Sequence, residues 1–176
     1  MQSFAHGGEQ GRPTEAVLVG TLRLNQLYTV GEIIGRGENS TVHKVLHRVT
    51  GQVAALKVFD RKLFPTEASM RFLKNEISIL KSLKSEYVPV LYNVFQDKSN
   101  FYILQELCDQ GELFTALKRE QKYILVLDSR FEVAKIKDYG LQIAKAIEYI
   151  HSQNVVHRDV KLGNIALKTP GRIVNS

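Results

Sequence analysis

The chain has 176 residues, of which 44% are apolar and 24% are charged, with one cysteine and a net charge of +6. This composition is typical of a folded globular protein, and a single cysteine excludes an intramolecular disulfide and a thiolate metal cluster. Because no apolar run approaches the roughly 20 residues of a membrane-spanning helix and no secretory signal core is present, we expect a cytoplasmic protein without a membrane span.

The first part of the chain predicts a tail followed by strands. Residues 1–24 contain several glycines and no clear periodicity, so we expect a flexible N-terminal tail. Runs of β-branched and apolar residues then predict three strands, at 28–35, 41–47 and 53–59. The dipeptide Thr50-Gly51 between the last two strands predicts a hairpin turn.

The middle of the chain predicts one helix and two more strands. Pro65 suits a helix start, and residues 66–84 carry an apolar stripe with helical period. The positions of that stripe are Phe72, Glu76, Ile79, Leu80 and Leu83. Two further strands are predicted at 88–95 and 101–107, with a polar turn between them.

The last part of the chain predicts helices. Residues 111–120 predict a short helix, 123–130 fit no regular element, and 139–153 predict a longer amphipathic helix. The stripe of the longer helix consists of Tyr139, Ile143, Ala146, Ile147 and Ile150. Strands with one helix among them, followed by helices, predict an α+β fold that begins with a five-stranded antiparallel sheet.

Two charged residues lie within apolar patterns. Lys57 stands in the middle of an apolar strand, and Glu76 lies inside the helical stripe. Each by itself is explained by a long side chain that reaches solvent. If the helix packs on the sheet, the two together predict a buried ion pair. Such pairs add little stability, which favours a functional role.

A glycine-rich turn is predicted between the first two strands, in "GRGENSTV" at 35–42. Glycines let backbone N–H groups approach phosphate oxygens closely, although most glycine-rich turns are only turns. Ser40 occupies the third glycine position of a G-x-G-x-x-G pattern. Because the turn joins two strands, it fits neither a dinucleotide-binding fingerprint nor a P-loop.

A cluster of polar residues lies between two apolar runs in "VVHRDVKLGNIAL", at 155–167. Asp159 can accept a proton or orient a hydroxyl, and Lys161 can neutralise a phosphoryl group. Asn164 offers an amide oxygen to a hard cation such as Mg²⁺. Phosphoryl transfer needs this set because its catalysis consists mostly of positioning and charge neutralisation. A polar loop after a helix explains any two of these residues, whereas the full ordered string favours phosphoryl transfer.

In their order and spacing these motifs resemble the eukaryotic protein kinase family, over about residues 28–176. "GRGENSTV" resembles the loop over ATP, "VAALK" the strand that carries a nucleotide-binding lysine, and "HRDVKLGN" the catalytic loop. A lysine at position 161 is the serine/threonine pattern. "YNVFQDKSNFYI" and "GELF" are similar to the AGC-related group and its phosphoinositide-dependent kinases.

The resemblance implies roles for single residues. Lys57 would hold the α- and β-phosphates of ATP, and Glu76 would be its partner on helix αC. Asp159 would be the catalytic base, Lys161 would assist the γ-phosphate, and Asn164 would bind Mg²⁺. The residues implied at the nucleotide are Ile34, Gly35, Gly37, Ser40, Val42, Ala55, Lys57, Glu106, Cys108 and Glu112, with Gln105 as gatekeeper.

The resemblance also implies a division into an N-lobe, residues 25–107, and the first part of a helical C-lobe, residues 108–176. "GRIVNS" at the end resembles the strand that leads into the family's D-F-G motif, which these 176 residues do not contain. We therefore expect a serine/threonine kinase fragment with little or no activity by itself. Its full form would transfer phosphate from ATP to serine or threonine hydroxyls of a protein substrate.

Two other functions stay open at this point. A non-catalytic nucleotide-binding or decoy module would keep the nucleotide cleft without performing the transfer. The net charge of +6 fits a nucleic-acid binder, but the basic residues are spread along the chain, so we expect no nucleic-acid partner. The sequence leaves the protein substrate and the oligomeric state undetermined.

Overall fold

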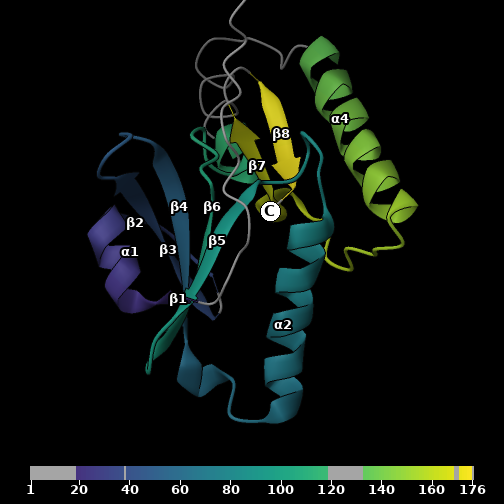
Figure 1. The fold of residues 1–176 in the computed structure, drawn as a ribbon. Coiled ribbons are helices and arrows are strands. Elements are labelled where there is room, and N and C mark those ends of the chain that lie inside the picture. The colour runs from purple at the N-terminus through teal and green to yellow at the C-terminus, as the bar shows by residue number, and fades with distance from the viewer. Residues whose placement is uncertain (1–18, 38, 119–132, 169–170, 176) are drawn as a thin grey trace, which may run out of the picture.

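A computed structural model describes residues 19–37, 39–118, 133–168 and 171–175. The larger of its two sheets has the strand order β1-β5-β6-β4-β3-β2 (Figure 1). These strands are β1 (Val19–Gly20), β2 (Tyr28–Arg36), β3 (Ser40–His47), β4 (Val53–Asp60), β5 (Leu91–Gln96) and β6 (Asn100–Glu106). The five expected antiparallel strands are confirmed, and β1 adds a short parallel pairing to the edge strand β5.

Helices and a second, smaller sheet complete the described fold. The helices are α1 (Thr21–Leu27), α2 (Glu67–Ser82) and α4 (Val133–Ser152), together with a helical segment at 113–118. The 3₁₀ turns are η1 (Arg61–Leu63) and η2 (Leu162–Asn164). The small sheet pairs β7 (Ile165–Lys168) with β8 (Arg172–Asn175) in antiparallel orientation. The unassigned stretch 123–130 and the end of the predicted helix 111–120 lie outside the described residues.

The prediction of a flexible tail over residues 1–24 is wrong for its last residues, from Val19 onward. Within the expected tail 1–24, the structure has β1 and the first turns of α1. Leu24 of α1 is only 2% exposed and packs with Val45 and Leu56 on one face of the large sheet. A single apolar contact of this kind leaves no periodic signal in so short a helix, and for that reason the sequence did not reveal it.

Alternating side chains divide the large sheet into two apolar faces. Leu56 of β4 and Leu104 of β6 pack in the cluster covered by α1. Phe59 and Ile103 of the same two strands pack in a separate cluster with Leu73 of α2. Because successive residues of a strand point to opposite faces, these strands support α1 on one side and α2 on the other (Figure 1).

Helix α2 begins where the sequence predicts but packs with a different face. Thr66 caps it, accepting a hydrogen bond at Oγ1 from the Ser69 N–H at 3.1 Å. The contacts with the sheet come from Met70, Leu73 and Ile77. The expected stripe is partly wrong, since it includes Phe72, 73% exposed, as well as Glu76 and Ile79, which are also exposed. Both stripes have helical spacing, so periodicity alone cannot tell which one meets the sheet.

Helix α4 begins at Val133, before the predicted start at 139, and its predicted apolar stripe packs against the small sheet. Tyr139 lies in a buried cluster with Ile165 of β7 and Ile173 of β8, and Ala146 and Ile150 are buried along the same stripe. In the part of the chain that the structure describes, no helix has the length and apolar character required to cross a membrane.

The burial of Leu24 generates the first prediction. Replacing Leu24 with Ala should lower the free energy of unfolding by about 2–4 kcal/mol, because it removes a buried side chain and leaves a cavity in the core. Leu27→Ala in the same helix is the matched control, since Leu27 is 38% exposed and should cost much less. Urea unfolding followed by circular dichroism measures both, and equal losses would contradict the placement of α1.

Candidate functional site

The polar residues of the predicted catalytic loop form one hydrogen-bonded group, the Asp159 cluster (Asp159, Lys161 and Asn164). Lys161 Nζ lies 2.7 Å from Asp159 Oδ2. Asn164 Nδ2 donates to the same carboxylate oxygen at 2.9 Å and to the Asp159 carbonyl oxygen at 2.8 Å. The structure therefore brings together a carboxylate, an ammonium and an amide at one point of the surface, as the sequence predicts.

The backbone of this loop explains how the cluster forms. Arg158 has a φ of 67°, in the left-handed region that residues other than glycine rarely adopt. The next N–H, of Asp159, donates to His157 Nδ1 at 3.3 Å, and η2 follows with the Asn164 N–H bonded to the Lys161 carbonyl at 2.9 Å. The reversal at Arg158 and the 3₁₀ turn set the three side chains of the cluster close together. Backbone strain of this kind is common at functional sites.

Electrostatics keep the Asp159 carboxylate ionised. The hydrogen bonds from Lys161 and Asn164 lower the pKa of Asp159 below its ordinary value, with Lys161 the larger contributor. The side chain is also largely open to solvent. An exposed, ionised carboxylate can accept a hydrogen bond from an incoming hydroxyl group and orient it, while the ammonium beside it attracts an anion.

Lys57 and Glu76 do not form the expected ion pair. Lys57 lies on β4, opposite Val42 of β3, and its Nζ is 5.2 Å from the centroid of the Phe59 ring. Among the described residues, no ion pair within 4.0 Å joins Lys57 to Glu76, which is exposed on α2. Helix α2 contacts the sheet through Met70, Leu73 and Ile77, and Glu76 lies at the edge of this contacting face with its side chain exposed.

The glycine-rich turn between β2 and β3 is a hairpin, as predicted. The Gly37 N–H donates to the Ser40 carbonyl oxygen at 2.9 Å, and Gly35 pairs with Val42 across the hairpin. A Cβ at position 37 would lie 2.9 Å from Ser40 Oγ, closer than real Cβ atoms come. A larger residue at position 37 would therefore require the Ser40 side chain to move, and the absence of a side chain lets the backbone approach a phosphate closely. Ile34, also predicted at the nucleotide, lies half-exposed at the start of this turn.

The residues predicted around a nucleotide base follow one continuous path. Ala55 of β4 is buried and pairs with Gln105 of β6, one residue before β6 ends at Glu106. The connector, residues 107–112, then reaches β7, where Glu112 forms an isolated bridge with Ala166. The residues predicted to surround the nucleotide base therefore lie on elements that are joined to one another: β4, the end of β6, the connector and β7.

The connector is attached to β7 by backbone hydrogen bonds. The Gln110 N–H donates to the Leu167 carbonyl at 3.0 Å, and the Leu167 N–H donates to the Gly111 carbonyl at 2.8 Å. Sequence reasoning missed Lys168, the next residue of β7, which forms an ion pair with Glu106. No local signal could have found this pair, because its members are 62 positions apart in the chain.

Cys108 lies in the connector as a free cysteine, and its thiol favours the protonated form. Burial raises the pKa of its thiol to about 11, and the negative charge of Glu106 adds to the increase. A thiol of this kind is rarely a thiolate, and the thiolate is the nucleophile and metal ligand. The expectation that Cys108 contributes backbone groups rather than its sulfur is consistent with this burial.

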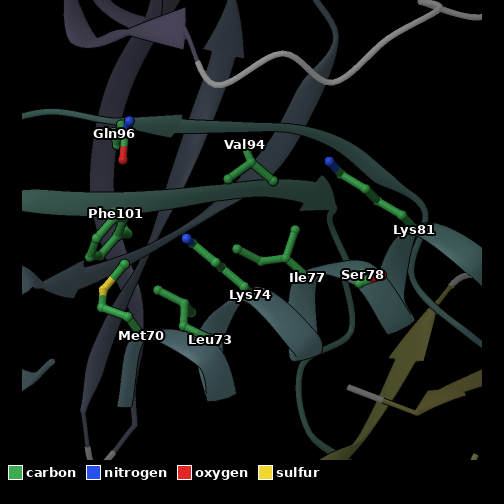
Figure 2. Close-up of a pocket in the computed structure, with 9 residues that line it drawn as sticks. All are labelled: Met70, Leu73, Lys74, Ile77, Ser78, Lys81, Val94, Gln96 and Phe101. Atoms are coloured by element: carbon green, nitrogen blue, oxygen red, sulfur yellow. The ribbon is translucent and has the colours of Figure 1, made fainter. Parts of the chain in front are cut away.

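A separate apolar pocket of about 230 Å³ lies where α2 meets β5 and β6 (Figure 2). Its apolar wall includes Leu73, Ile77, Val94 and Phe101. None of the residues predicted to bind the nucleotide lines it, so this pocket is distinct from the candidate site. Its presence shows that α2 and the sheet do not close completely against each other, in keeping with Leu73 as the one buried residue of the helix.

The donor groups present fit a nucleotide and a hard cation. The turn at Gly37 offers backbone to phosphate, and Lys57 and Lys161 supply positive charge. Asn164 belongs to the oxygen-donor class that Mg²⁺ prefers. Within the described residues there is no group of three or more His, Cys, Asp or Glu side chains that would hold a metal by themselves. Any Mg²⁺ bound among them would therefore depend on phosphate oxygens as well.

Comparison with known proteins agrees with the resemblance seen in the sequence. A family model described as the protein kinase domain matches residues 28–174. Three curated relatives are each 34% identical to the chain. They are 3-phosphoinositide-dependent protein kinase 1 of Arabidopsis thaliana, calcium-dependent protein kinase 5 of Plasmodium berghei and Aurora kinase of Debaryomyces hansenii. The alignments cover 83%, 86% and 81% of this chain, and 28%, 25% and 32% of those relatives.

The chain thus spans less than a third of the length of these relatives. The expected similarity to a phosphoinositide-dependent kinase is confirmed. The same identity to two kinases of other names shows that the similarity is not special to that one type.

The Asp159 cluster predicts a perturbed titration. In the wild-type chain the pKa of Asp159 should lie below that of an ordinary aspartate, and Lys161→Met should raise it, because the strongest stabilising partner of the carboxylate is removed. Carbon-detected NMR titration of the side-chain carboxyl measures the midpoint. Lys137→Met on α4 is the control and should leave it unchanged. An unaltered midpoint in Lys161→Met would contradict the observed pairing.

The buried thiol generates a second prediction from this site. At pH 8, iodoacetamide should alkylate Cys108 about a hundredfold more slowly than a cysteine in a short peptide, because so little thiolate forms. The rate should rise with pH up to about 11, the pKa of the group. Unfolding in urea is the control and should restore the ordinary rate. A native-state rate equal to that of the peptide would show that Cys108 is not buried.

Proposed function

This chain belongs to the protein kinase family, and we propose that its residues bind ATP in a protein that phosphorylates serine or threonine hydroxyls of other proteins. The observation that carries the proposal is the Asp159 cluster, in which Lys161 and Asn164 both contact one carboxylate oxygen. Phosphoryl transfer requires a group that orients the hydroxyl and positive charge near the moving phosphate, and this cluster supplies both.

The proposed roles follow the chemistry of each group. Asp159, ionised and open to solvent, accepts a hydrogen bond from the substrate hydroxyl and takes its proton as the hydroxyl oxygen bonds to the γ-phosphorus and the bond from that phosphorus to the bridging oxygen breaks, releasing ADP. Lys161, beside it, neutralises charge on the γ-phosphate. Lys57 of β4 holds the α- and β-phosphates, and the backbone at Gly37 approaches the phosphates from the β2–β3 turn. Mg²⁺, when bound, would neutralise phosphate oxygens, and Asn164 is its proposed ligand here.

The nucleotide base would lie along the path from β4 through the connector to β7. Val42 and Ala55 provide apolar contacts, and Ala55 is buried next to the end of β6. Backbone groups of Glu106 and Cys108 would bind the edge of adenine, and Glu112 would lie near the ribose. The placement of these residues on connected elements supports the proposal.

The serine/threonine preference rests on Lys161, two residues after Asp159 in the loop. The three relatives compared above are all named as kinases, and the chain matches them over most of its own length. Because it spans less than a third of theirs, the activity of the whole protein and its protein substrate remain part of the proposal.

A second candidate is a nucleotide-binding module that performs no transfer. The separation of Lys57 from Glu76 favours it, since a Lys57 that lies beside the Phe59 ring and does not pair with Glu76 is held less firmly for the phosphates. The two functions differ in one outcome, because both predict binding of ATP and only the first predicts transfer of phosphate.

Binding of ATP is predicted by both candidate functions, and a nucleotide titration tests it directly. The purified 176-residue chain, titrated with a fluorescent ATP analogue and Mg²⁺, should bind it, and Lys57→Met should weaken binding about tenfold by removing a charge-assisted contact to phosphate. Lys98→Met, in the turn between β5 and β6, is the matched lysine control and should bind as the wild type does. A wild-type chain that binds no ATP would refute both functions.

Transfer of phosphate separates the two functions. In a longer protein that contains this chain, Asp159→Asn should reduce labelled-phosphate transfer to a serine or threonine peptide by about 10²–10⁴-fold, as for loss of a general base. Binding of ATP should stay within about twofold of the wild type, because Asp159 acts on the hydroxyl. Binding without any transfer by the wild-type protein would favour the non-catalytic module.

A further inference from the structure

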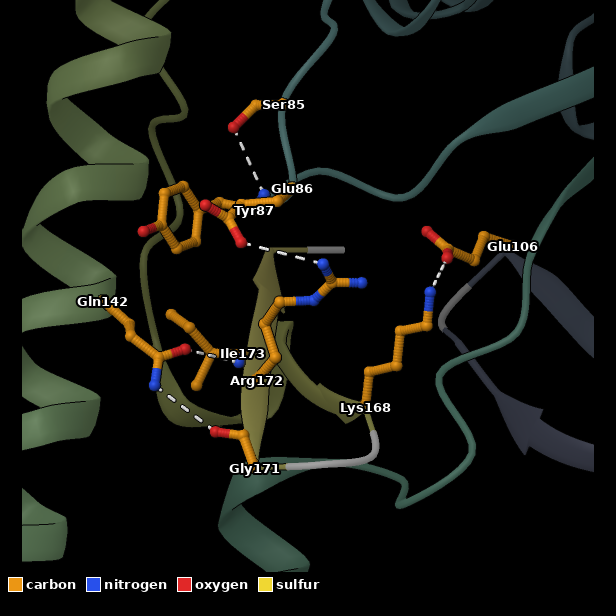
Figure 3. Close-up of polar contacts among 9 residues, drawn as sticks. All are labelled: Ser85, Glu86, Tyr87, Glu106, Gln142, Lys168, Gly171, Arg172 and Ile173. Carbon is orange, nitrogen blue, oxygen red and sulfur yellow. Dashed lines mark hydrogen bonds and ion pairs between the residues drawn. The ribbon is translucent and has the colours of Figure 1, made fainter. Parts of the chain in front are cut away.

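An ion pair connects Glu106, the last residue of β6, to Lys168, the last residue of β7. Lys168 Nζ contacts Glu106 Oε1, and their side chains are 28% and 16% exposed (Figure 3). The second oxygen of the same carboxylate, Oε2, accepts a hydrogen bond from the Val90 N–H at 3.4 Å. Glu106 is therefore held from two directions, by β7 and by the segment that precedes β5.

The pair lies at the point where the chain leaves the large sheet. Glu106 is the last residue of β6 and pairs with Ala54 of β4, and the connector starts at the next residue. Lys168 follows Leu167, whose backbone bonds to Gln110 and Gly111 of the connector. The connector is thus fixed at its start by the side-chain pair and by a hydrogen bond from the Glu106 N–H to the Val90 carbonyl oxygen at 2.9 Å, and further along by two more backbone hydrogen bonds.

The partial burial of both charges indicates that the pair serves to orient the backbone rather than to stabilise the fold. Taking two charges partly out of water removes most of the stability that their attraction provides. Losing only one partner, by contrast, leaves the other charge partly buried and unpaired, so the carboxylate of Glu106 would turn toward solvent. The backbone of Glu106 would then lose one of the contacts that orient it.

We propose that Lys168 is a positioning residue for adenine binding, because its pairing with the Glu106 carboxylate fixes the backbone at the start of the connector. This inference rests on the proposed function, in which the Glu106 and Cys108 backbone groups bind the edge of adenine. Lys168 itself touches no part of the nucleotide. Its effect is pre-organisation, since a connector already held in the bound geometry loses less freedom when the base binds.

If Lys168 positions the connector for adenine, its loss should affect only the affinity of ligands that contain the base. The phosphates are assigned to Lys57, Lys161 and the glycine-rich turn, and none of these is bonded to Lys168. Removing Lys168 should therefore weaken ligands that contain adenine and leave a bare triphosphate unaffected. A merely structural role would weaken both classes of ligand together.

A second cross-connection provides the matched control. Arg172 of β8 lies 3.7 Å from Glu86, in the segment before β5, and both side chains are more exposed than those of the first pair (Figure 3). Like Lys168, Arg172 is a cation of the small sheet that reaches an acid near the large one. Its charge acts on the Cys108 thiol, but through this pair it holds the segment before β5 and not the backbone of the connector, so its loss should not alter adenine binding.

The experiment measures displacement of a fluorescent ATP analogue from the 176-residue chain by ATP, by adenosine and by tripolyphosphate. Lys168→Met should weaken ATP and adenosine about five- to tenfold and leave tripolyphosphate unchanged. Lys168→Arg, which keeps the charge, should restore affinity to within about twofold. Arg172→Met should behave as the wild type for all three ligands.

Glu106→Gln tests the pair from its other side and serves also if Lys168→Met fails to fold. It should reproduce the loss of adenosine affinity, and the double variant Glu106→Gln with Lys168→Met should show no further loss, because both changes break one interaction. Thermal unfolding checks that each variant is folded.

The outcomes separate this inference from the function on which it rests. A wild-type chain that binds none of the ligands overturns the proposed function and this inference with it. A wild-type chain that binds ATP, together with unchanged adenosine affinity in Lys168→Met or in Glu106→Gln, overturns only the inference. An equal loss of tripolyphosphate affinity overturns it as well, since the effect would then not be directed at the base.

Discussion

The alternation of side chains along β4 and β6 is the constraint on which the rest of the structure depends. Leu56 and Leu104 point to the face that α1 covers, and Phe59 and Ile103 point to the face that α2 covers. With period two fixed, Lys57 must share the α2 face with Phe59. The packing of the core therefore determines on which face of the sheet Lys57 lies, independently of any charge interaction that the lysine makes.

The same constraint explains the separation of Lys57 and Glu76. Helix α2 is anchored through Leu73, which packs in one buried cluster with Phe59 and Phe101 of the sheet. Apolar burial determines the rotation of a helix on a sheet more strongly than one exposed charge does. With Met70, Leu73 and Ile77 facing the sheet, Glu76 lies at the edge of the contacting face and is exposed, and the apolar pocket shows that the contact between α2 and the sheet leaves a gap. The acid and the lysine thus lie on neighbouring elements without forming a pair.

The two ends of the candidate site are built in different ways. The Asp159 cluster is local, since its members lie within six residues and are assembled by one backbone reversal and a 3₁₀ turn. The base end is non-local, because it joins β4, the end of β6, the connector and β7. The pair of Glu106 with Lys168 joins the end of β6 to the end of β7 and adds to the backbone hydrogen bonds between the connector and β7.

The sequence by itself determined the five antiparallel strands, the helix that follows Pro65 between the third and fourth of them, and the composition of the Asp159 cluster. Each of these depends on residues close together in the chain, where period, capping and turn chemistry act directly. Only the tertiary structure decided the burial of Leu24, the face of α2 that meets the sheet, the solvent-facing Glu76 and the partner of Lys168. These depend on which distant surfaces pack together, and a helical or strand-like pattern is compatible with more than one such packing.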